Sequence, residues 1–330
     1  MKWLKLRTWR YVLLALLVLA APLKADYRDR DEVRVFAAEM ARDHGFSEEG
    51  IIRVIGQAEY KQSIIDAISR PAERVLTWAE YQDIFLTDRR VRAGHDFMME
   101  HKDALIRAQE IYGVPPVIIT AIIGVETMYG QIRGSYRVLD ALSTLAFDYP
   151  PRSKFFRKEL KEFLLLVREQ NQDITDLKGS YAGAMGYGQF IPSSYRAYAI
   201  DFDDDGVIDI WNNPTDAIGS VANYFARHGW QPNDLVVVRA DAEGVQEDLF
   251  NTSLKPTLSA GDLKRLGVVA SLEDSTDVAP FLFRGKQGEE IWLGLKNFYV
   301  ITRYNHSKLY AMAIFQLSEA LKLDQGIAGR

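Results

Sequence analysis

Residues 114–130 constrain the fold more than any other stretch, and they read VPPVIITAIIGVETMYG. Pro115 and Pro116 suit the first turn of a helix, where a missing backbone N–H costs nothing. The residues that follow are apolar on every side, which predicts a buried helix. A single carboxylate, Glu126, stands at the end of the apolar run, and Gly130 is placed to end the helix just beyond it.

Glu126 shares its helix face with Ile122 and Ile123, which lie one turn earlier. Apolar surroundings disfavour the charged form of a carboxyl group, so the sequence predicts a raised pKa for Glu126. A group that donates a proton near neutral pH needs such a pKa. The alternative is a structural glutamate at a helix end that reaches water or pairs with an arginine.

The N-terminal 25 residues differ from the rest of the chain. They carry five positive charges and no acid, and residues 11–21 form an apolar run that is too short to span a bilayer. This pattern predicts a secretory signal peptide that ends at Ala25, the alternative being an uncleaved inner-membrane anchor. Without these residues the net charge changes from −5 to −10. An acidic exported protein is not expected to bind nucleic acid.

The chain has 330 residues and no cysteine. The absence of cysteine in the sequence excludes a lipoprotein anchored through an N-terminal Cys, thiol catalysis and Cys-based zinc sites. The histidines show no HExxH spacing, so a catalytic zinc site is not expected. An exported protein without disulfides depends on its core, and here on a metal, for stability.

Helical periodicity covers most of the chain and changes to a strand pattern near its C-terminal end. The predicted helices are 31–44, a segment capped by Ser47, 87–112, 136–146, 155–169, 215–228 and 307–323. The predicted strands are 236–238, 268–270, 281–283 and 291–301. The sequence therefore predicts a predominantly α-helical α+β fold with a small β-rich subdomain at 234–304.

Residues 179–195, GSYAGAMGYGQFIPSSY, contain four glycines within ten residues. Glycine allows a backbone to approach another group closely. Ser180, Tyr187 and Gln189 supply a hydroxyl, an aromatic ring and an amide between the glycines. This mixture suits a sugar, which needs hydrogen bonds and flat apolar surfaces together. The alternative is a loop that serves only tight packing between helices.

Residues 201–212, DFDDDGVIDIWN, have the spacing of a calcium-binding loop. Acidic residues fall at positions 1, 3, 5 and 9, and glycine falls at position 6. The predicted ligands are Asp201, Asp203, Asp205, the Val207 carbonyl and Asn212. Position 12 is Asn212 and not the bidentate glutamate of a sensor, which favours a structural Ca²⁺ over a signalling one. The alternative is a solvated acidic turn.

Three stretches, GVETMYG, GSYAGAMGYGQFIPSSYRAYAIDFDDDGVIDIWN and DAIGSVANYFARHGW, strongly resemble the membrane-bound lytic murein transglycosylase B family of bacteria. The resemblance covers about residues 30–324. It implies a transglycosylase region at 26–330 with a lysozyme-like core at 87–230, which includes the EF-hand-like loop 201–212. It also implies cleavage of the β-1,4 bond between N-acetylmuramic acid and N-acetylglucosamine, with a 1,6-anhydromuramyl product and no organic cofactor.

Transferred position by position, the resemblance makes Glu126 the catalytic acid and base. It places in the sugar cleft Ser180, Gln189, Tyr224, Asn305, Tyr81, Tyr187, Tyr304 and Tyr310. Relatives have an arginine pair after a Tyr-Pro turn where this chain has Pro151-Arg152, so Arg152 alone remains to contact a peptide stem. The implied partners are peptidoglycan glycan strands and proteins of cell-wall synthesis or division. A periplasmic monomer is expected.

No second acid stands in a catalytic context, since Asp140 and Asp148 lie in ordinary helix and turn patterns. Most glycosidases use two carboxylates. With one, Glu126 would protonate the glycosidic oxygen and then remove a proton from the 6-hydroxyl of the sugar, which attacks C1. Two alternatives stay open: a lysozyme-type hydrolase that uses water, and a non-catalytic peptidoglycan-binding scaffold.

Overall fold

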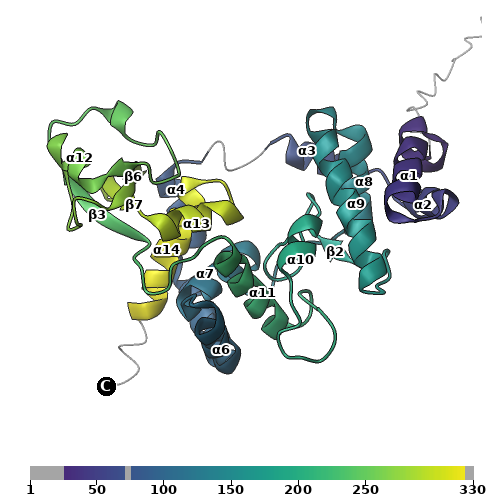
Figure 1. Ribbon diagram of the computed structural model, residues 1–330, viewed down its shortest axis with the longest axis horizontal. Coiled ribbons are helices and arrows are strands. Elements are labelled where there is room, and N and C mark those ends of the chain that lie inside the picture. Colours follow the sequence, from purple (N-terminus) through teal and green to yellow (C-terminus); the bar gives the residue numbers. More distant parts are fainter. Residues whose placement is uncertain (1–25, 71–75, 324–330) are drawn as a thin grey trace, which may run out of the picture. The chain divides into compact units, whose positions relative to one another are not determined.

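The computed structural model describes residues 26–70 and 76–323 (Figure 1). The chain divides into two compact units, Met1–Gly56 and Gln57–Arg330. The predicted signal peptide lies outside the described residues. Among the described helices none is long and apolar enough to cross a membrane by itself, and one pair, Lys102–Tyr112 with Pro116–Thr127, passes by length and composition but is bent by 115°.

The first unit contains a short 3₁₀ turn, η1 (Tyr27–Asp29), followed by α1 (Asp31–His44) and α2 (Glu48–Ile55). The buried face of α1 carries Val33, Phe36, Ala37 and Met40. The Ser47 hydroxyl accepts a hydrogen bond from the Gly50 N–H at 3.2 Å and caps α2. Both predicted helices are therefore confirmed.

The second unit is mostly helical. Its helices are α3 (Gln62–Ile68), α4 (Trp78–Phe85), α5 (Asp88–Glu100), α6 (Lys102–Tyr112), α7 (Pro116–Thr127), α8 (Val138–Asp148), η3 (Pro150–Arg152), α9 (Ser153–Glu169), α10 (Pro192–Tyr198), α11 (Pro214–Arg227), η4 (Glu247–Leu249), α12 (Ala260–Arg265), α13 (Lys296–Tyr304) and α14 (Lys308–Leu323). Four predicted helices correspond to α8, α9, α11 and α14, with small shifts at their ends.

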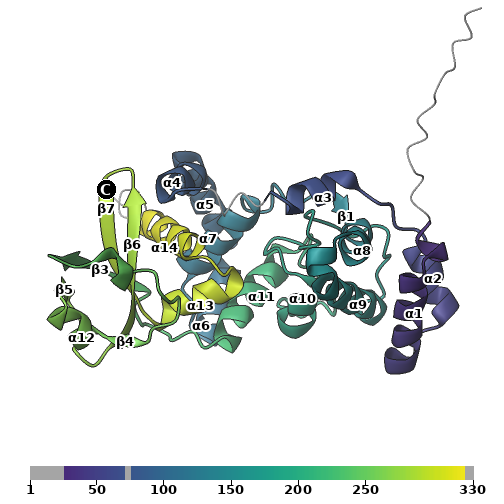
Figure 2. The same cartoon turned by 90° about the horizontal axis from the view of Figure 1, so that it is seen from above.

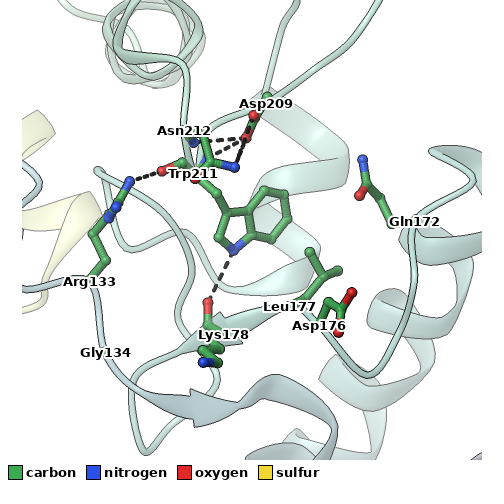
Figure 3. A pocket seen from close by; sticks show the side chains of 9 residues that line it. All are labelled: Arg133, Gly134, Gln172, Asp176, Leu177, Lys178, Asp209, Trp211 and Asn212. Atoms are coloured by element: carbon green, nitrogen blue, oxygen red, sulfur yellow. Dashed lines mark hydrogen bonds between the residues drawn. The ribbon is translucent and has the colours of Figure 1, made fainter.

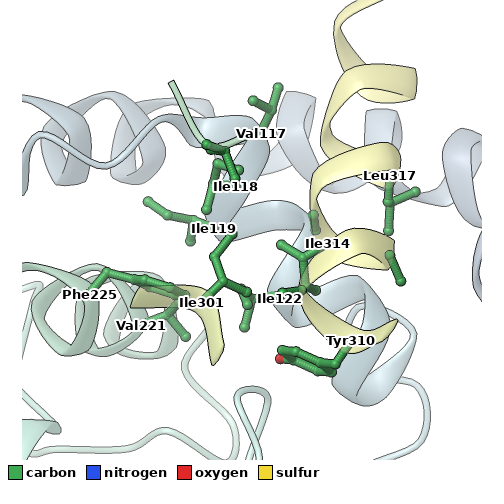
Figure 4. Close-up of a cluster of buried hydrophobic side chains, with 14 of the residues drawn as sticks. Val117, Ile118, Ile119, Ile122, Val221, Phe225, Ile301, Tyr310, Ile314 and Leu317 are labelled. Carbon is green, nitrogen blue, oxygen red and sulfur yellow. The ribbon is translucent and has the colours of Figure 1, made fainter. Parts of the chain in front are cut away.

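The apolar helix α7 lies at the centre of the largest hydrophobic cluster (Figure 4). It packs against α5, α6, α11 and α14. Ile118, Ile119 and Ile122 of α7 are buried against side chains of the other helices, among them Val221, Phe225, Ile314 and Leu317. The prediction of a buried helix is therefore confirmed.

A five-stranded antiparallel sheet with the strand order β4-β6-β7-β3-β5 forms the β-rich part of the second unit (Figure 2). Its strands are β3 (Val237–Ala242), β4 (Leu258–Ser259), β5 (Val268–Val269), β6 (Asp277–Gly285) and β7 (Gly288–Gly294). A separate pair joins β1 (Tyr136–Arg137) to β2 (Lys178–Gly179). Phe281 and Phe283 of β6 belong to the large helical core, whereas Leu282 and Val278 belong to a smaller cluster with α12. The predicted fold class is confirmed.

Two predicted elements were wrong. The helix predicted over 87–112 breaks at His101, whose backbone (φ −111°, ψ 26°) ends α5 and begins α6. The break lets Phe97 and Leu105 both enter the same core. The strand predicted over 291–301 ends at Gly294, where a β-carbon would lie 2.6 Å from the Phe281 ring. The chain then continues as α13, because Phe298 and Ile301 lie three residues apart, which places both on one face of a helix but on opposite faces of a strand.

Candidate active site

Glu126 lies in the last turn of α7 and is half-buried. The helix ends at Thr127, and the next three residues, Met128, Tyr129 and Gly130, all take positive φ angles of 51°, 58° and 83°. Consecutive left-handed residues are unfavourable for side chains other than glycine, so other contacts must hold this turn. The prediction that Gly130 ends the helix was therefore wrong in detail, because Met128 already takes the left-handed capping position.

Hydrogen bonds hold the turn after Glu126. The Thr127 hydroxyl lies 3.1 Å from the Ile123 carbonyl oxygen and 2.9 Å from that of Tyr187, and it accepts from the Gly130 N–H at 2.9 Å. The Tyr129 hydroxyl donates to the Arg90 carbonyl at 2.9 Å. A β-carbon at Gly130 would lie 2.1 Å from the Tyr187 ring, so only glycine fits there. The strained turn thus joins the end of α7 to the glycine-rich segment.

The Glu126 carboxylate faces two tyrosines from the C-terminal part of the chain, the buried Tyr310 and the partly buried Tyr304. The Tyr310 hydroxyl donates a hydrogen bond of 2.6 Å to Glu126 Oε1. The Tyr304 and Tyr310 rings are stacked at 6.4 Å between centroids and 7° between planes. Burial raises the pKa of both phenols well above their usual value, and the nearby Glu126 charge raises it further. Both tyrosines therefore stay neutral near pH 7, and Tyr310 is a fixed hydrogen-bond donor to the carboxylate.

The glycine-rich segment packs closely on these groups. The Tyr304 hydroxyl donates to the Gly188 carbonyl. The Gln189 side-chain amide donates to the carbonyl oxygens of Gly186 at 3.0 Å and of Arg133 at 3.3 Å. The Ser180 hydroxyl oxygen accepts the N–H groups of Ala182 and Ala184 at 3.3 and 3.1 Å. Close packing accounts for much of the glycine content, and the role of this segment in binding a sugar stays a prediction.

The other predicted cleft residues lie in different environments. The Tyr224 ring packs edge-on against Tyr304 at 4.8 Å, and its hydroxyl donates to the Arg303 carbonyl at 2.6 Å. Tyr81 is buried near Tyr310 and contacts Trp78 and Phe85. Asn305 follows Tyr304 directly at the end of α13.

Arg152 is the exception. It lies on η3, with its guanidinium over the rings of Phe155 and Phe156 at 4.5 and 5.1 Å. Within the described residues it makes no hydrogen bond or ion pair with the group around Glu126. The structure therefore brings most of the predicted residues together but does not join Arg152 to them.

Asp140, the nearest acid in sequence after Glu126, has a structural environment. It is buried, forms a two-pronged ion pair with Arg137 at 2.7 and 2.9 Å, and accepts the Glu59 N–H at 2.8 Å. These contacts occupy both oxygens of the Asp140 carboxylate. Asp140 is therefore not a candidate for the second catalytic acid.

The acidic loop brings three carboxylates together. One oxygen from each of Asp201, Asp203 and Asp205 lies within 4.8 Å of the others. Three carboxylates in this spacing, with the Val207 carbonyl next in the loop, supply the hard oxygen ligands that Ca²⁺ prefers, so the residues fit the ion. The acid at position 9, Asp209, is not in this group. It accepts the N–H groups of Trp211 and Asn212, each at 2.9 Å, and an N–H of the Asn212 side chain.

Asp216 is a loop-organising residue that sequence reasoning missed. It is buried at the start of α11, and its two oxygens accept the N–H groups of Phe202 and Asp209, each at 2.7 Å. Burial raises its pKa, and these two hydrogen bonds act in the opposite direction. The only signal in the sequence was an acidic residue in the first turn of a predicted helix. Acidic residues are common there because the helix dipole favours a negative charge at the N-terminus.

The end of the acidic loop is bonded to the glycine-rich segment. The Tyr187 N–H donates to the Ile210 carbonyl at 3.0 Å, and Arg133 donates to the Trp211 carbonyl. The Trp211 indole N–H donates to the Lys178 carbonyl oxygen at 3.1 Å, and both residues line a cavity of about 420 Å³ (Figure 3). The Arg133 guanidinium also lies 5.1 Å from the Tyr187 ring centroid. The loop and the cleft segment therefore share one hydrogen-bond network.

Comparison with known proteins identifies the family. A family model described as the transglycosylase SLT domain matches residues 28–319. The chain belongs to this family. It is 41% identical over 309 residues to membrane-bound lytic murein transglycosylase B of Escherichia coli (strain K12), a match that covers 90% of this chain and 84% of that protein. The chain is a lytic transglycosylase of peptidoglycan.

Solved structures of SLT-domain transglycosylases agree with the fold. Soluble lytic transglycosylase SltB1 from Pseudomonas aeruginosa is 54% identical with a TM-score of 0.86, covering 89% of this chain and 99% of that one. The Escherichia coli lytic transglycosylase Slt35 in complex with calcium is 41% identical with a TM-score of 0.83, covering 91% and 95%. The lysozyme-like fold of the family is thus confirmed for this chain.

His228 packs against Tyr224, and its burial makes the stability of the fold depend on pH. Its ring stacks on Tyr224 at 4.0 Å, and its Nδ1 lies 2.7 Å from the Tyr224 carbonyl oxygen. Burial lowers its pKa below the usual value of about 6.5. The unfolded chain therefore takes up a proton that the folded chain resists as the pH falls below about 6.5, and the free energy of unfolding decreases.

We expect His228→Gln to reduce this acid-dependent loss, measured by urea unfolding between about pH 7.5 and about pH 5.5. The exposed His306 provides the control, because His306→Gln should keep the slope of the parent chain. His101, whose pKa burial also lowers, is present in all three proteins. An unchanged slope in His228→Gln would contradict the assignment.

Proposed function

We propose that Glu126 is the single acid–base group of this transglycosylase, and that it acts on the β-1,4 bond between N-acetylmuramic acid and N-acetylglucosamine. The observation that carries the proposal is the environment of the carboxylate. It stands in the last turn of a largely buried helix and accepts a hydrogen bond from neutral Tyr310. Asp140, the next acid in the sequence, is already paired with Arg137. The predicted rise in the pKa of Glu126 stays a prediction.

In the proposed reaction Glu126 donates one proton and then accepts another. Glu126 protonates the glycosidic oxygen as the bond between that oxygen and muramyl C1 breaks. The muramyl N-acetyl group stabilises the positive charge at C1. The Tyr310 hydroxyl stabilises the carboxylate that remains. Glu126 then takes the proton of the muramyl 6-hydroxyl, whose oxygen bonds to C1 and forms the 1,6-anhydro ring. An internal nucleophile has the entropic advantage of proximity, so no water is consumed.

The cleft residues have proposed roles that follow from their contacts. The Ser180 oxygen accepts two backbone N–H groups, which leaves its own O–H to donate to a sugar oxygen. Gln189, Tyr187 and Asn305 supply further polar and aromatic contacts. Tyr304, together with the buried Tyr81 and Tyr224, positions Tyr310 and the glycine-rich segment. Arg152, apart from the others, contacts a peptide stem. A relative, SltB3 from Pseudomonas aeruginosa (28% identical), has been solved in complex with NAG-NAM-pentapeptide.

The proposed setting is the periplasm. The similarity to a relative named membrane-bound lytic murein transglycosylase B supports a location in the cell envelope. We assign export to residues 1–25 and expect a monomer that acts on glycan strands, with cell-wall synthesis or division proteins as further partners.

Replacing Glu126 tests the proposal directly. We expect Glu126→Gln to lower the release of anhydromuropeptides from purified sacculi by at least about 10²–10⁴-fold, because the amide can neither donate nor accept a proton near neutral pH. Mass spectrometry of the released products measures both the amount and the type of end. Glu110→Gln on the exposed face of α6 makes the same chemical change elsewhere and should keep full activity. Near-full cleavage by Glu126→Gln would refute the assignment, and reducing muramic acid ends would indicate a hydrolase.

A structural calcium ion is the second part of the proposal. We assign as its ligands the carboxylates of Asp201, Asp203 and Asp205 and the carbonyl of Val207. The Asn212 side chain donates its N–H to Asp209, which leaves its oxygen for the ion. When bound, Ca²⁺ would offset most of the negative charge of the three acidic groups and fix the loop, without taking part in the reaction.

Removing the ion with a chelator should lower the melting temperature and leave the activity of the folded fraction unchanged. Asp203→Asn should abolish most of the rise in melting temperature that added Ca²⁺ causes. Asp204→Asn is the matched control, because Asp204 lies in the same loop but pairs with Arg107. Equal melting temperatures with Ca²⁺ and with chelator would contradict the site.

A further inference from the structure

A second cavity, of about 350 Å³, lies on the side of the sheet that faces the helices. Strand β3 contributes Arg239, and β7 contributes Glu290 and Trp292. Helices α4 and α14 contribute Gln82 and Gln316. None of these residues belongs to the Glu126 site or to the acidic loop.

Strand register places the three sheet residues on one face. Arg239 stands opposite Trp292 in the β3–β7 pair, and Glu290 precedes Trp292 by two residues on β7. Side chains at such positions project from the same side of a sheet. Trp292 also pairs with Phe281 on β6 and packs edge-on against Phe315 of α14 at 5.8 Å. One face of the sheet thus passes from hydrophobic core to a polar cavity at Trp292.

Glu290 and Arg239 both contact the Trp292 indole but form no ion pair with each other. Glu290 is only 8% exposed, and its Oε2 accepts the Trp292 indole N–H at 2.9 Å. The Arg239 guanidinium lies 5.6 Å from the Trp292 ring centroid. Within the described residues neither side chain has an ion-pair partner, whereas neighbouring Arg284 and Lys286 both pair with acids. A nearly buried carboxylate without a cation is costly unless something else compensates for the charge.

We propose that this cavity binds a zwitterionic α-amino-acid end, with its ammonium group on Glu290 and its carboxylate on Arg239. A guanidinium suits a carboxylate because it donates two parallel hydrogen bonds. The Trp292 ring supplies a flat surface for the aliphatic carbons, and the amides of Gln82 and Gln316 lie at the cavity wall for the polar groups of a peptide.

We assign as the occupant the free amino-acid end of a diamino acid in a peptidoglycan peptide stem. This assignment rests on the proposed function. Helix α14 carries both Tyr310, at Glu126, and Gln316, at the cavity. Six helical residues rise by about 9 Å. An extended peptide spans at most about 3.3–3.6 Å per residue, so a stem of three or more residues is long enough for this distance. Tyr81 and Gln82 are likewise adjacent on α4.

Calorimetry with the full chain carrying Glu126→Gln tests the proposal without turnover. The probe is a disaccharide tripeptide that ends in a diamino acid with a free amine and carboxylate. Acetylation of the amine should weaken binding by at least about tenfold, since a charged hydrogen bond is lost. Arg239→Gln should weaken binding of the unmodified probe by a similar factor, and Arg284→Gln, the control, should not change it.

Glu290→Gln adds a coupled test, because the amide oxygen still accepts from the Trp292 indole. In this variant acetylation of the probe should cause no further loss. Should Glu290→Gln fail to fold, the exposed Arg239 still decides the question. Equal affinity for the free and acetylated probes, or no effect of Arg239→Gln, overturns the proposal.

Two further measurements distinguish a failure of the cavity proposal from a failure of the proposed function. Free diaminopimelate that binds as tightly as the muropeptide, with the same dependence on Arg239, would overturn the stem assignment in favour of a free amino acid. Cleavage of sacculi by the chain with native Glu126 tests the proposed function by itself. Normal cleavage together with equal affinity for both probes would refute the cavity alone, whereas absent cleavage would refute the proposed function.

Discussion

The burial of α7 is the constraint on which the other features depend. A helix that is apolar on all sides must be covered on all sides, and α5, α6, α11 and α14 cover it. Only its C-terminal end remains for polar chemistry, and Glu126 stands there. The same packing fixes α14, which brings Tyr310 within 2.6 Å of the carboxylate. The packing of the core therefore also determines the position of Glu126.

A second layer of order comes from hydrogen bonds between loops. Thr127 joins the end of α7 to Tyr187, Tyr187 joins the glycine-rich segment to Ile210, and Asp216 fixes the acidic loop that contains Ile210. Through these hydrogen bonds, a metal ion in that loop would stabilise Tyr187 and Thr127 without contacting the reacting atoms. This arrangement explains how an ion can support the fold of an active site while taking no part in its chemistry.

Local patterns were enough to predict the buried helix that carries Glu126 and the grouping of acids in the loop, because each depends on residues close together in sequence. The Tyr310–Glu126 hydrogen bond joins residues 184 positions apart. The resemblance to a family placed Tyr310 in the cleft, but nothing in the sequence predicted this bond. The break at His101 could not be predicted, since both flanking segments are good helices. The pairing of Arg239 with Trp292 depends on strand register, and the strand predicted at 236–238 stopped short of Arg239.

Cleavage in water labelled with heavy oxygen tests most directly the claim that one carboxylate and an internal hydroxyl are sufficient. Sacculi or a defined glycan would be cleaved by the mature chain in such water, and the ends would be analysed by mass spectrometry. If the muramyl 6-hydroxyl attacks C1, every new end is an anhydromuramyl group without the label. Labelled reducing muramic acid ends would show that water is the nucleophile and would contradict the account.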